Sequence, residues 1–527
     1  MNRVNDLYKL VLLELIAVAL ISIGILDRTF AFLLLAILAA FILTKPFKES
    51  LELFLLSLPF YIALPVSTGF DSMSMWRPLS LLLVILWLWE KRGILWEDPL
   101  AFWDEFLRRR GLLYLTGAFF IFIFIATISL LWASDIGSGV KAIIYFINIF
   151  LILFIYAWEL THQDLLRLIK RAGQVSGFFL FVGFLQFAGT FFVPLYEFWQ
   201  WWAAYPISAY YGSQTSNLVS YSNTWFSYYS EKLPATLRIF SLFQDSHAFA
   251  MFTILGASAW GTLYFLFKEE GRKKGVLFSL ALVVISLLAI ILSGARGSWV
   301  AAGLLALILL VLNSTRSVLV ELPRALVKKS LAALAIFFLL FPISSILLAG
   351  EQKAQLIIEG RGGEAADLRL AFLRARSAFD IEELSNKGRI EIWEASLIFL
   401  FKNSFLTGTG IGNFPTVIEL TPEKSRLGAS AHSLYLQLLV ELGLFGLLAF
   451  FAIIFLILKQ AYKILALHVT RYTLHAYYAF SFLFAFLWVL LYSLVDVTLL
   501  NDKVFLFAAI LIGILYSMEY ETSTKTN

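Results

Sequence analysis

The 527-residue sequence has no cysteine and few histidines, and each shortage excludes a kind of chemistry. Without cysteine the chain cannot form disulfides, use a thiolate nucleophile or bind zinc through sulfur. None of the five histidines forms a pair at i, i+4 spacing, so a metalloprotease-like zinc pair is also missing. We therefore expect no metal and no other cofactor.

Charge is also scarce: 15% of the residues are charged and 60% are hydrophobic, with a mean hydropathy of +0.83. A soluble core could not bury that much apolar surface, so a lipid bilayer must cover the remainder. The net charge of +5 does not indicate a nucleic-acid partner, because the lysines and arginines fall in short runs between apolar segments. That distribution is a signal of membrane topology.

Fourteen apolar stretches are each roughly long enough to cross ~30 Å of hydrocarbon as a helix. We predict an all-α, polytopic integral membrane bundle of about 12 to 14 transmembrane helices, without a cleavable signal peptide. The stretches start near Leu7, Thr29, Leu51, Leu79, Leu112, Ile143, Val175, Ala248, Val276, Ser298, Leu331, Ser433, Leu474 and Val504.

Basic runs occupy every second loop, which predicts that these loops and both termini are cytoplasmic. The intervening loops then face outward, and two of them are long. The expected divisions are N-terminal transmembrane helices over 1–193, an outward aromatic-rich loop over 194–246, transmembrane helices over 247–349, a large, mostly helical outward loop over 350–431, and C-terminal transmembrane helices over 432–527.

The first long loop is dense in Trp, Tyr, Ser and Asn, as in WQWWAAYPISAYYGSQTSN. Such a composition suits stacking on sugar rings, or a position at the headgroup level of the bilayer. We favour the second interpretation, because aromatic belts at membrane interfaces are common.

The second long loop contains an amphipathic segment followed by a glycine-rich turn. Ile390, Trp393, Leu397 and Leu400 recur at helical spacing, which predicts a helix that lies on the membrane surface or caps the bundle. The turn TGTGIGNF resembles a phosphate-binding loop only superficially, because no strand precedes it and no βαβ pattern surrounds it. A helix-ending turn is the better interpretation.

Three basic positions stand out on the predicted outer side. Arg296, in LSGARGSW, lies in a short turn between two apolar helices, near membrane level. Arg389 opens the segment GRIEIW, where the free amides of a helix N-terminus would also attract an anion. His432 opens the next apolar helix and, with a reference pKa of ~6.5, can accept a proton at physiological pH.

Each position also has a structural interpretation. Arg296 could extend toward the lipid headgroups, and we weigh this about equally with ligand binding. Arg389 could pair with Glu391 or Glu394, which is the favoured interpretation for an isolated arginine in a charged loop. His432 could be an ordinary helix-end residue. The functional interpretation depends on all three lying on one side of the membrane.

The segment from about Ser293 to Gly446 resembles the O-antigen ligase and O-antigen polymerase superfamily of bacterial envelope glycosyltransferases. Three signatures carry the resemblance: the Arg-Gly of SGARGSW, the arginine and aromatic of GRIEIW with the glycine-rich turn after it, and HSLYLQLLVELGLFG. The upstream LRIFSLFQDSHAFA, with Arg238, resembles the family's approach to the preceding helix. The N-terminal half resembles the family only as a run of spans.

The resemblance implies transfer of a glycan from undecaprenyl diphosphate to a hydroxyl on a glycolipid, glycan or protein acceptor, by a metal-independent inverting mechanism. The reaction would take place on the periplasmic or extracellular face of the cytoplasmic (inner) membrane. Arg296 and Arg389 would bind the diphosphate, and His432 would be the catalytic base. Arg238, Glu441 and Ser433 are possible supporting residues; a carboxylate such as Glu441 inside an apolar helix is costly and so needs a reason.

Two alternatives stay open. An O-antigen or polysaccharide polymerase of the same superfamily differs from a ligase chiefly in its acceptor. A transporter or flippase for lipid-linked glycans is a different class; it would be expected to show repeated halves and charges along a path through the membrane, and the sequence contains no internal repeat.

Overall fold

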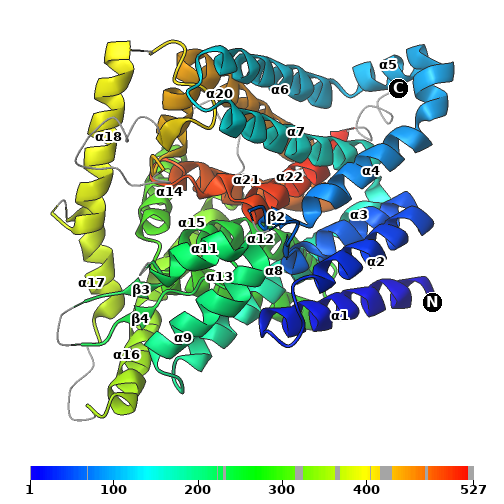
Figure 1. The fold of residues 1–527 in the computed structure, drawn as a ribbon. Helices are drawn as coiled ribbons and strands as arrows, with labels where there is room; N and C mark the ends of the chain where they lie inside the picture. Colours follow the sequence, from blue (N-terminus) through cyan, green and yellow to red (C-terminus); the bar gives the residue numbers. More distant parts are fainter. Residues whose placement is uncertain are drawn as a thin grey trace. The chain divides into compact units, whose positions relative to one another are not determined.

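The computed structural model describes residues 2–67, 69–221, 224–229, 233–314, 324–361, 368–380, 382–403, 405–415, 430–468 and 473–519. Almost all of its regular structure is helical (Figure 1), as the sequence predicts, and the strands in the described residues form two short antiparallel pairs. The chain divides into two compact units, which we describe separately. Unit 1 contains residues 1–91, 163–299 and 329–375, and unit 2 contains residues 92–162, 300–328 and 376–527.

Unit 1 is built from long apolar helices and one region of short elements. Arg28 and Asp71 form an ion pair at 2.9 Å, and the Ser213 amide also donates to Asp71 at 2.8 Å, so the loop before β2 is tied to the start of α11. The helices and strands are α1 (Asn2–Ser22), α2 (Phe30–Thr44), α3 (Phe47–Leu56), η1 (Leu58–Phe60), β1 (Ala63–Leu64), β2 (Met73–Ser74), α4 (Trp76–Glu90), α8 (His162–Gly189), α9 (Leu195–Trp202), η4 (Ala203–Ile207), α10 (Ser208–Tyr211), α11 (Ser213–Ser220), β3 (Phe226–Ser227), β4 (Thr236–Leu237), α12 (Ser246–Glu269), α13 (Lys273–Leu292), α15 (Arg324–Leu339), α16 (Phe341–Ile358) and α17 (Leu370–Arg376).

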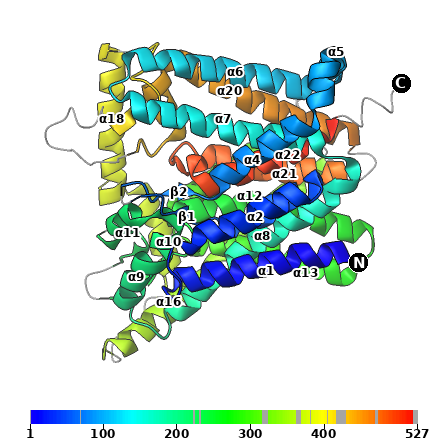
Figure 2. The same ribbon diagram turned by 45° about the vertical axis from the view of Figure 1, so that its right-hand side comes forward.

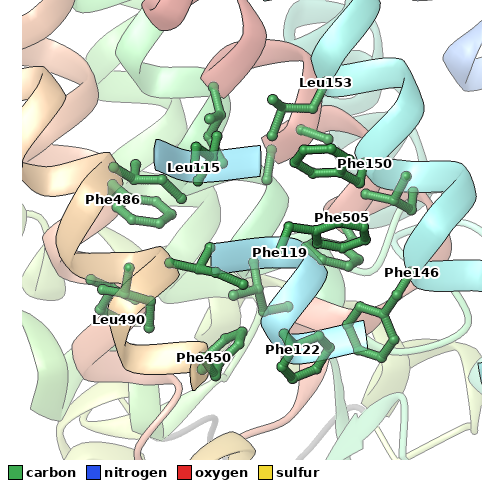
Figure 3. Close-up of a pocket in the computed structure, with 18 residues that line it drawn as sticks. Leu115, Phe119, Phe122, Phe146, Phe150, Leu153, Phe450, Phe486, Leu490 and Phe505 are labelled. Carbon is green, nitrogen blue, oxygen red and sulfur yellow. The ribbon is translucent and has the colours of Figure 1, made fainter. Parts of the chain in front are cut away.

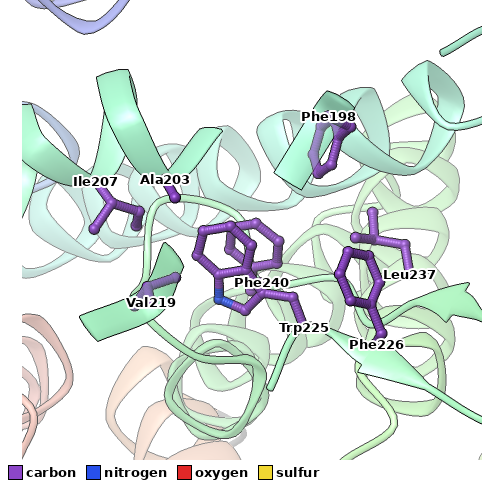
Figure 4. Packing of buried hydrophobic residues seen from close by; sticks show 8 residues of the cluster. All are labelled: Phe198, Ala203, Ile207, Val219, Trp225, Phe226, Leu237 and Phe240. Carbon is purple, nitrogen blue, oxygen red and sulfur yellow. The ribbon is translucent and has the colours of Figure 1, made fainter. Parts of the chain in front are cut away.

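The aromatic-rich loop folds into a small core of its own (Figure 4). Trp225 is 1% exposed and stacks on Phe240 with ring centroids 4.1 Å apart, while its indole N–H donates to the carbonyl of Gln244. Phe198 and Leu237 belong to the same cluster. Many of the aromatic side chains therefore pack against one another within the loop. Neither sequence interpretation, sugar stacking or a membrane belt, included this role.

Unit 2 contains the long helix α20, which has a kink at Gly443, where the backbone φ is +65°. Figures 1 and 2 both show α18 running across the ends of α6 and α7. The elements are η2 (Gly93–Glu97), α5 (Pro99–Arg108), α6 (Arg110–Ser129), η3 (Leu130–Trp132), α7 (Ile136–Glu159), η5 (Ser377–Phe379), α18 (Leu384–Asn403), α20 (Leu434–His468), α21 (Leu474–Tyr492), η7 (Thr498–Leu500) and α22 (Asp502–Ser517), and α14 (Arg296–Ser314) begins in unit 1 and continues into unit 2.

The apolar stretches of the sequence coincide with helices of the structure, except that the stretch from Leu51 is helical only to the end of α3 and continues as η1 and β1. Within the described residues, nine helical segments are long and apolar enough to cross a membrane, so the chain is a multi-pass membrane protein. They are Arg110–Trp132, Ile136–Glu159, His162–Gly189, Ser246–Glu269, Lys273–Leu292, Arg296–Ser314, Leu326–Ile358, Leu434–Leu467 and Leu474–Tyr492. Phe30–Thr44 is also apolar but shorter. The orientation of these helices stays a prediction.

Candidate functional site

Arg296 is the first residue of α14 and follows a tight turn after α13. The turn depends on Gly294, whose φ of +63° is strained for any residue with a side chain. The Arg296 side chain is buried, with 6% of its surface exposed. A buried guanidinium argues against the interpretation that Arg296 merely extends to the lipid headgroups.

Arg238 holds this turn in place through hydrogen bonds to its backbone. Its Nε donates to the carbonyl of Ser293 at 3.1 Å and one Nη to the carbonyl of Gly294 at 3.5 Å, while the other Nη donates to the carbonyl of Thr224 at 3.0 Å. A Cβ on Gly294 would lie only 3.1 Å from Arg238 Cγ and Nε. Arg238 and the Arg296 turn are therefore one packed arrangement within unit 1.

His247 completes this arrangement. Its Nε2 lies 3.0 Å from Arg238 Nη2. Because a guanidinium can only donate, Nε2 must accept, which places the ring proton of a neutral His247 on Nδ1. His247 belongs to the first turn of α12, and the Asp245 carboxylate caps that helix by accepting from the Ala248 amide at 2.7 Å.

The strand just before Arg238, β4, is held by a residue that was not identified from the sequence. Glu351 of α16 is fully buried and accepts from the amide of Leu237 at 2.8 Å. Gln352 donates to the carbonyl of Pro234 at 3.1 Å, on the same hairpin. Nearby, burial raises the pKa of Tyr229, and its hydroxyl accepts from Thr236 at 3.3 Å. The available signal was a carboxylate directly after the apolar run ISSILLAG.

In unit 2, His432 lies immediately before α20, as the sequence predicted. Its φ of +47° is in the left-handed region, one of two such non-glycine residues among those described. This conformation is uncommon in residues other than glycine, although histidine adopts it more often than most, and it persists where surrounding contacts favour it. Such strain is concentrated at functional sites, so it marks His432 as a candidate on structural grounds.

The residues on either side of His432 are held by α18 and by the turn after α21. On one side, the Trp393 indole of α18 donates to the carbonyl of Ala431 at 2.8 Å. On the other, the amide of Leu434 donates to the carbonyls of Ser493 and Asp496, at 3.0 and 3.2 Å, just after α21. Ser433 caps α20 by accepting from the amide of Leu436 at 3.4 Å, so its contacts are those of a helix cap.

The glycine-rich turn docks into the kink of α20. A Cβ on Gly408 would collide with the backbone of Glu441 and Gly443, and a Cβ on Gly443 would collide with the backbone of Leu406. The amides of Thr409 and Gly410 donate to the carbonyls of Val440 and Glu441 at 2.8 and 2.9 Å. Because these amides are already used, the turn is not a phosphate-binding loop. It does more than end a helix, since it replaces hydrogen bonds that the kink removes from α20.

Glu441 explains why α20 carries a buried carboxylate. It accepts from the amides of Gly412 and Phe414 at 2.9 and 3.4 Å and from the side chain of Gln437 at 3.3 Å. These hydrogen bonds offset the cost of a carboxylate in an apolar helix. Glu441 is thus a positioning residue for the glycine-rich turn.

Arg389 does not lie where the sequence predicted. The helix α18 begins at Leu384, so Arg389 is in its second turn and the free N-terminal amides are elsewhere. The helix starts earlier because the Glu383 carboxylate accepts from the amides of Ser385 and Asn386, both at 3.1 Å. Arg389 is half-buried, and its Nε is buried without a hydrogen-bond partner among the described residues.

The amphipathic prediction for α18 is confirmed in part. Leu400 is fully buried against Val440 and Phe414, so α18 caps the helices of unit 2. Ile390 and Leu397, which the same periodicity grouped with it, are each 41% exposed. Capping of the bundle is thus confirmed, and contact of the exposed apolar residues with the membrane surface stays a prediction.

The structure groups the predicted residues in two sets. Arg238 and Arg296 are joined in unit 1, whereas His432, Ser433 and Glu441 belong to unit 2 together with Arg389. In the described part of the chain, no three His, Asp or Glu side chains gather in a way that could hold a metal ion.

Residues 281–451 match the family model described as O-antigen ligase. This confirms the resemblance drawn from the three motifs, all of which lie inside the matched range. No curated protein matches the chain.

Proposed function

We propose that this member of the O-antigen ligase superfamily transfers a glycan from undecaprenyl diphosphate to an acceptor hydroxyl at the outer face of the cytoplasmic membrane. The observation that carries the proposal is the constrained backbone of His432, inside the segment that the family model matches. A left-handed conformation between contacts from α18 and from the turn after α21 favours a functional role over that of a residue that only begins a helix.

The proposed reaction is a single displacement. The acceptor oxygen attacks the anomeric carbon, the bond from that carbon to the diphosphate oxygen breaks, and the hydroxyl proton passes to His432. The diphosphate leaves with the bonding electrons, and the anomeric configuration inverts. General-base catalysis of this kind contributes typically 10²–10⁴-fold to the rate.

Arg296 and Arg389 are assigned to the diphosphate. A guanidinium offers two parallel donors to phosphate oxygens, and this charge-assisted pairing neutralises the charge that develops on the leaving group. Two observations support the assignment: Arg296 is buried, and Arg389 has an unused buried Nε. Arg238 would position Arg296 through the turn at Gly294.

The test is reconstitution in liposomes with a labelled polyprenyl-diphosphate oligosaccharide and candidate acceptors. His432→Ala should abolish transfer while donor binding is retained, whereas Arg296→Ala and Arg389→Ala should weaken binding as well as turnover. Arg272→Ala is a matched control, because Arg272 is exposed and its contacts with Glu270, at 3.2 Å, and with the Phe267 ring are local. Equal loss of folded protein in all three variants would assign them structural roles.

The destination of the label separates the alternatives. Label in longer chains that are still on diphosphate would identify a polymerase, and label on a lipid or protein would identify a ligase. Label that only crosses the bilayer would instead identify a transporter. Label that reaches an acceptor equally well without His432 would assign the chemistry to a different site.

A further inference from the structure

Unit 2 contains a pocket among its apolar helices that the proposed reaction does not use. Figure 3 shows aromatic side chains from several helices around it, including Phe119 of α6, Phe146 of α7, Phe450 of α20, Phe486 of α21 and Phe505 of α22. All of its lining side chains are aliphatic or aromatic, and its volume is about 80 Å³.

The lining determines which kind of molecule can occupy the pocket. A buried water needs two to four polar partners, and sugars or phosphates need more, so none of these would be stable there. A hydrocarbon would be stable, because it exchanges an empty apolar space for dispersion contacts. Ile453, Leu490 and Phe505 are only half-buried, so the pocket is open at its edge. The surrounding bilayer is the source of hydrocarbon chains.

The position of the pocket favours an acyl chain. Its walls come from helices that are long and apolar enough to cross a membrane, such as α6, α7 and α20, and its edge is open. Phospholipid acyl chains form the hydrocarbon core of the surrounding bilayer, so they meet this edge far more often than a polyprenyl chain does. We therefore assign the pocket to an acyl chain rather than to a polyprenyl chain.

The walls of the pocket are directly connected to the His432 segment. The hydroxyl of Tyr435 donates to the carbonyl of the lining residue Leu490 at 2.8 Å. Leu499, another lining residue, lies three residues after Asp496, whose carbonyl accepts from the Leu434 amide at 3.2 Å. A chain in the pocket would thus pack against the elements that hold His432 in its left-handed conformation.

We propose that this pocket binds the end of a lipid acyl chain and that the bound chain stabilises the arrangement of α20 and α21 around His432. Binding of the chain is independent of the reaction. Its effect on transfer rests on the proposed function, so the two are measured separately.

Binding is tested with the full chain in liposomes that contain a phospholipid with a diazirine at the end of one acyl chain. Illumination should label pocket residues such as Phe119 and Phe505, in addition to the exposed Phe120 and Phe124 of α6, which report ordinary lipid contact. A diazirine-bearing polyprenyl phosphate should label only the exposed residues. Labelling of the pocket by the polyprenyl probe, or by neither probe, would overturn the proposal.

A pocket-filling variant provides the second arm. Ala509 is 1% exposed and lines the pocket, so Ala509→Phe should lower acyl labelling of the pocket about ten-fold while labelling of Phe120 stays constant. The matched control is Ala452→Phe, the same substitution at an exposed position of α20. If Ala509→Phe does not fold, Ala509→Leu makes a smaller change at the same site.

The effect on transfer is read from the same variants. Ala509→Phe should reduce glycan transfer, whereas Ala452→Phe should not. Reduced acyl labelling with unchanged transfer would contradict an effect of the bound chain on His432, but would support the binding site. Absence of transfer in the wild type would contradict the proposed function without affecting the labelling result.

Discussion

The Glu441 carboxylate lies 2.9 Å from the backbone nitrogen of Gly412, 29 residues earlier in the chain. This hydrogen bond joins the glycine-rich turn to the interior of α20, close to the kink at Gly443. The glycine-rich turn and the segment HSLYLQLLVELGLFG are separate motifs in the sequence, but this contact makes them one structural unit.

Replacing Glu441 should destabilise the protein. In Glu441→Ala, the buried amides of Gly412 and Phe414 would lose their acceptor, and an unsatisfied buried group costs about 1–3 kcal/mol. Glu441→Gln keeps an acceptor oxygen and should cost less. Thermal unfolding in detergent measures the difference, and equal stability of the two variants would contradict the positioning role.

Gly294→Ala should impair donor binding. Alanine is strained at the φ of +63° that this position has, and its Cβ would lie 3.1 Å from Arg238. Both effects should displace the turn before Arg296. Gly303→Ala is the control, since Gly303 lies in the same helix as Arg296 and a Cβ there meets nothing within 4 Å. Donor affinity is the measurement; equal affinities in the two variants would show that the turn does not position Arg296.

Comparison of His432→Gly with His432→Ala should distinguish the backbone strain at this position from the catalytic role of its side chain. Both remove the base and should lower transfer by about 10²–10⁴-fold. Glycine tolerates the left-handed conformation and alanine does not, so His432→Gly should unfold at a higher temperature than His432→Ala. If the two variants melt together, the contacts around residue 432 do not impose the conformation after the substitution.

Asp71 should give unit 1 an acid-sensitive contact. Partial burial alone would raise its pKa, but hydrogen bonds from Ser213 and Arg28 outweigh this and lower the pKa below its ordinary value. The stabilisation is therefore fully present above the unfolded pKa of ~3.9 and is lost as the pH falls through the lower folded pKa. Asp71→Asn should reduce stability at pH 7, and the difference from wild type should shrink below about pH 4. A constant difference across that range would contradict this assignment.

The sequence predicted helices well and their junctions poorly. Apolar runs of about 20 residues predict helices such as α6, α12 and α20, because a segment that crosses the bilayer must satisfy its backbone hydrogen bonds within a helix. The early start of α18 depends on the side chain of Glu383, and the roles of Glu351 and Glu441 depend on partners far away in the sequence. Local periodicity carries no information on such contacts.

For the candidate residues too, local sequence patterns predicted positions but not long-range contacts. Arg296 and His432 could be selected from short motifs, since each lies at the end of an apolar run. That Arg238 fastens the Arg296 turn could not be predicted, because its partners at Ser293 and Gly294 are 55 and 56 residues away. The left-handed backbone of His432 could not be predicted either, because only a small fraction of histidines adopt this conformation.

The fit of the glycine-rich turn also bears on how the protein is assembled. Gly412 packs against Ser138 at the start of α7, and Gly408 against the kink of α20, so the turn has neighbours both earlier and later in the chain. During synthesis, α6 and α7 emerge first, the turn follows, and α20 comes after it. The hydrogen bonds that complete the kinked α20 can form only once the turn lies against both α7 and α20. We therefore expect the packing of α20 to be completed late in folding.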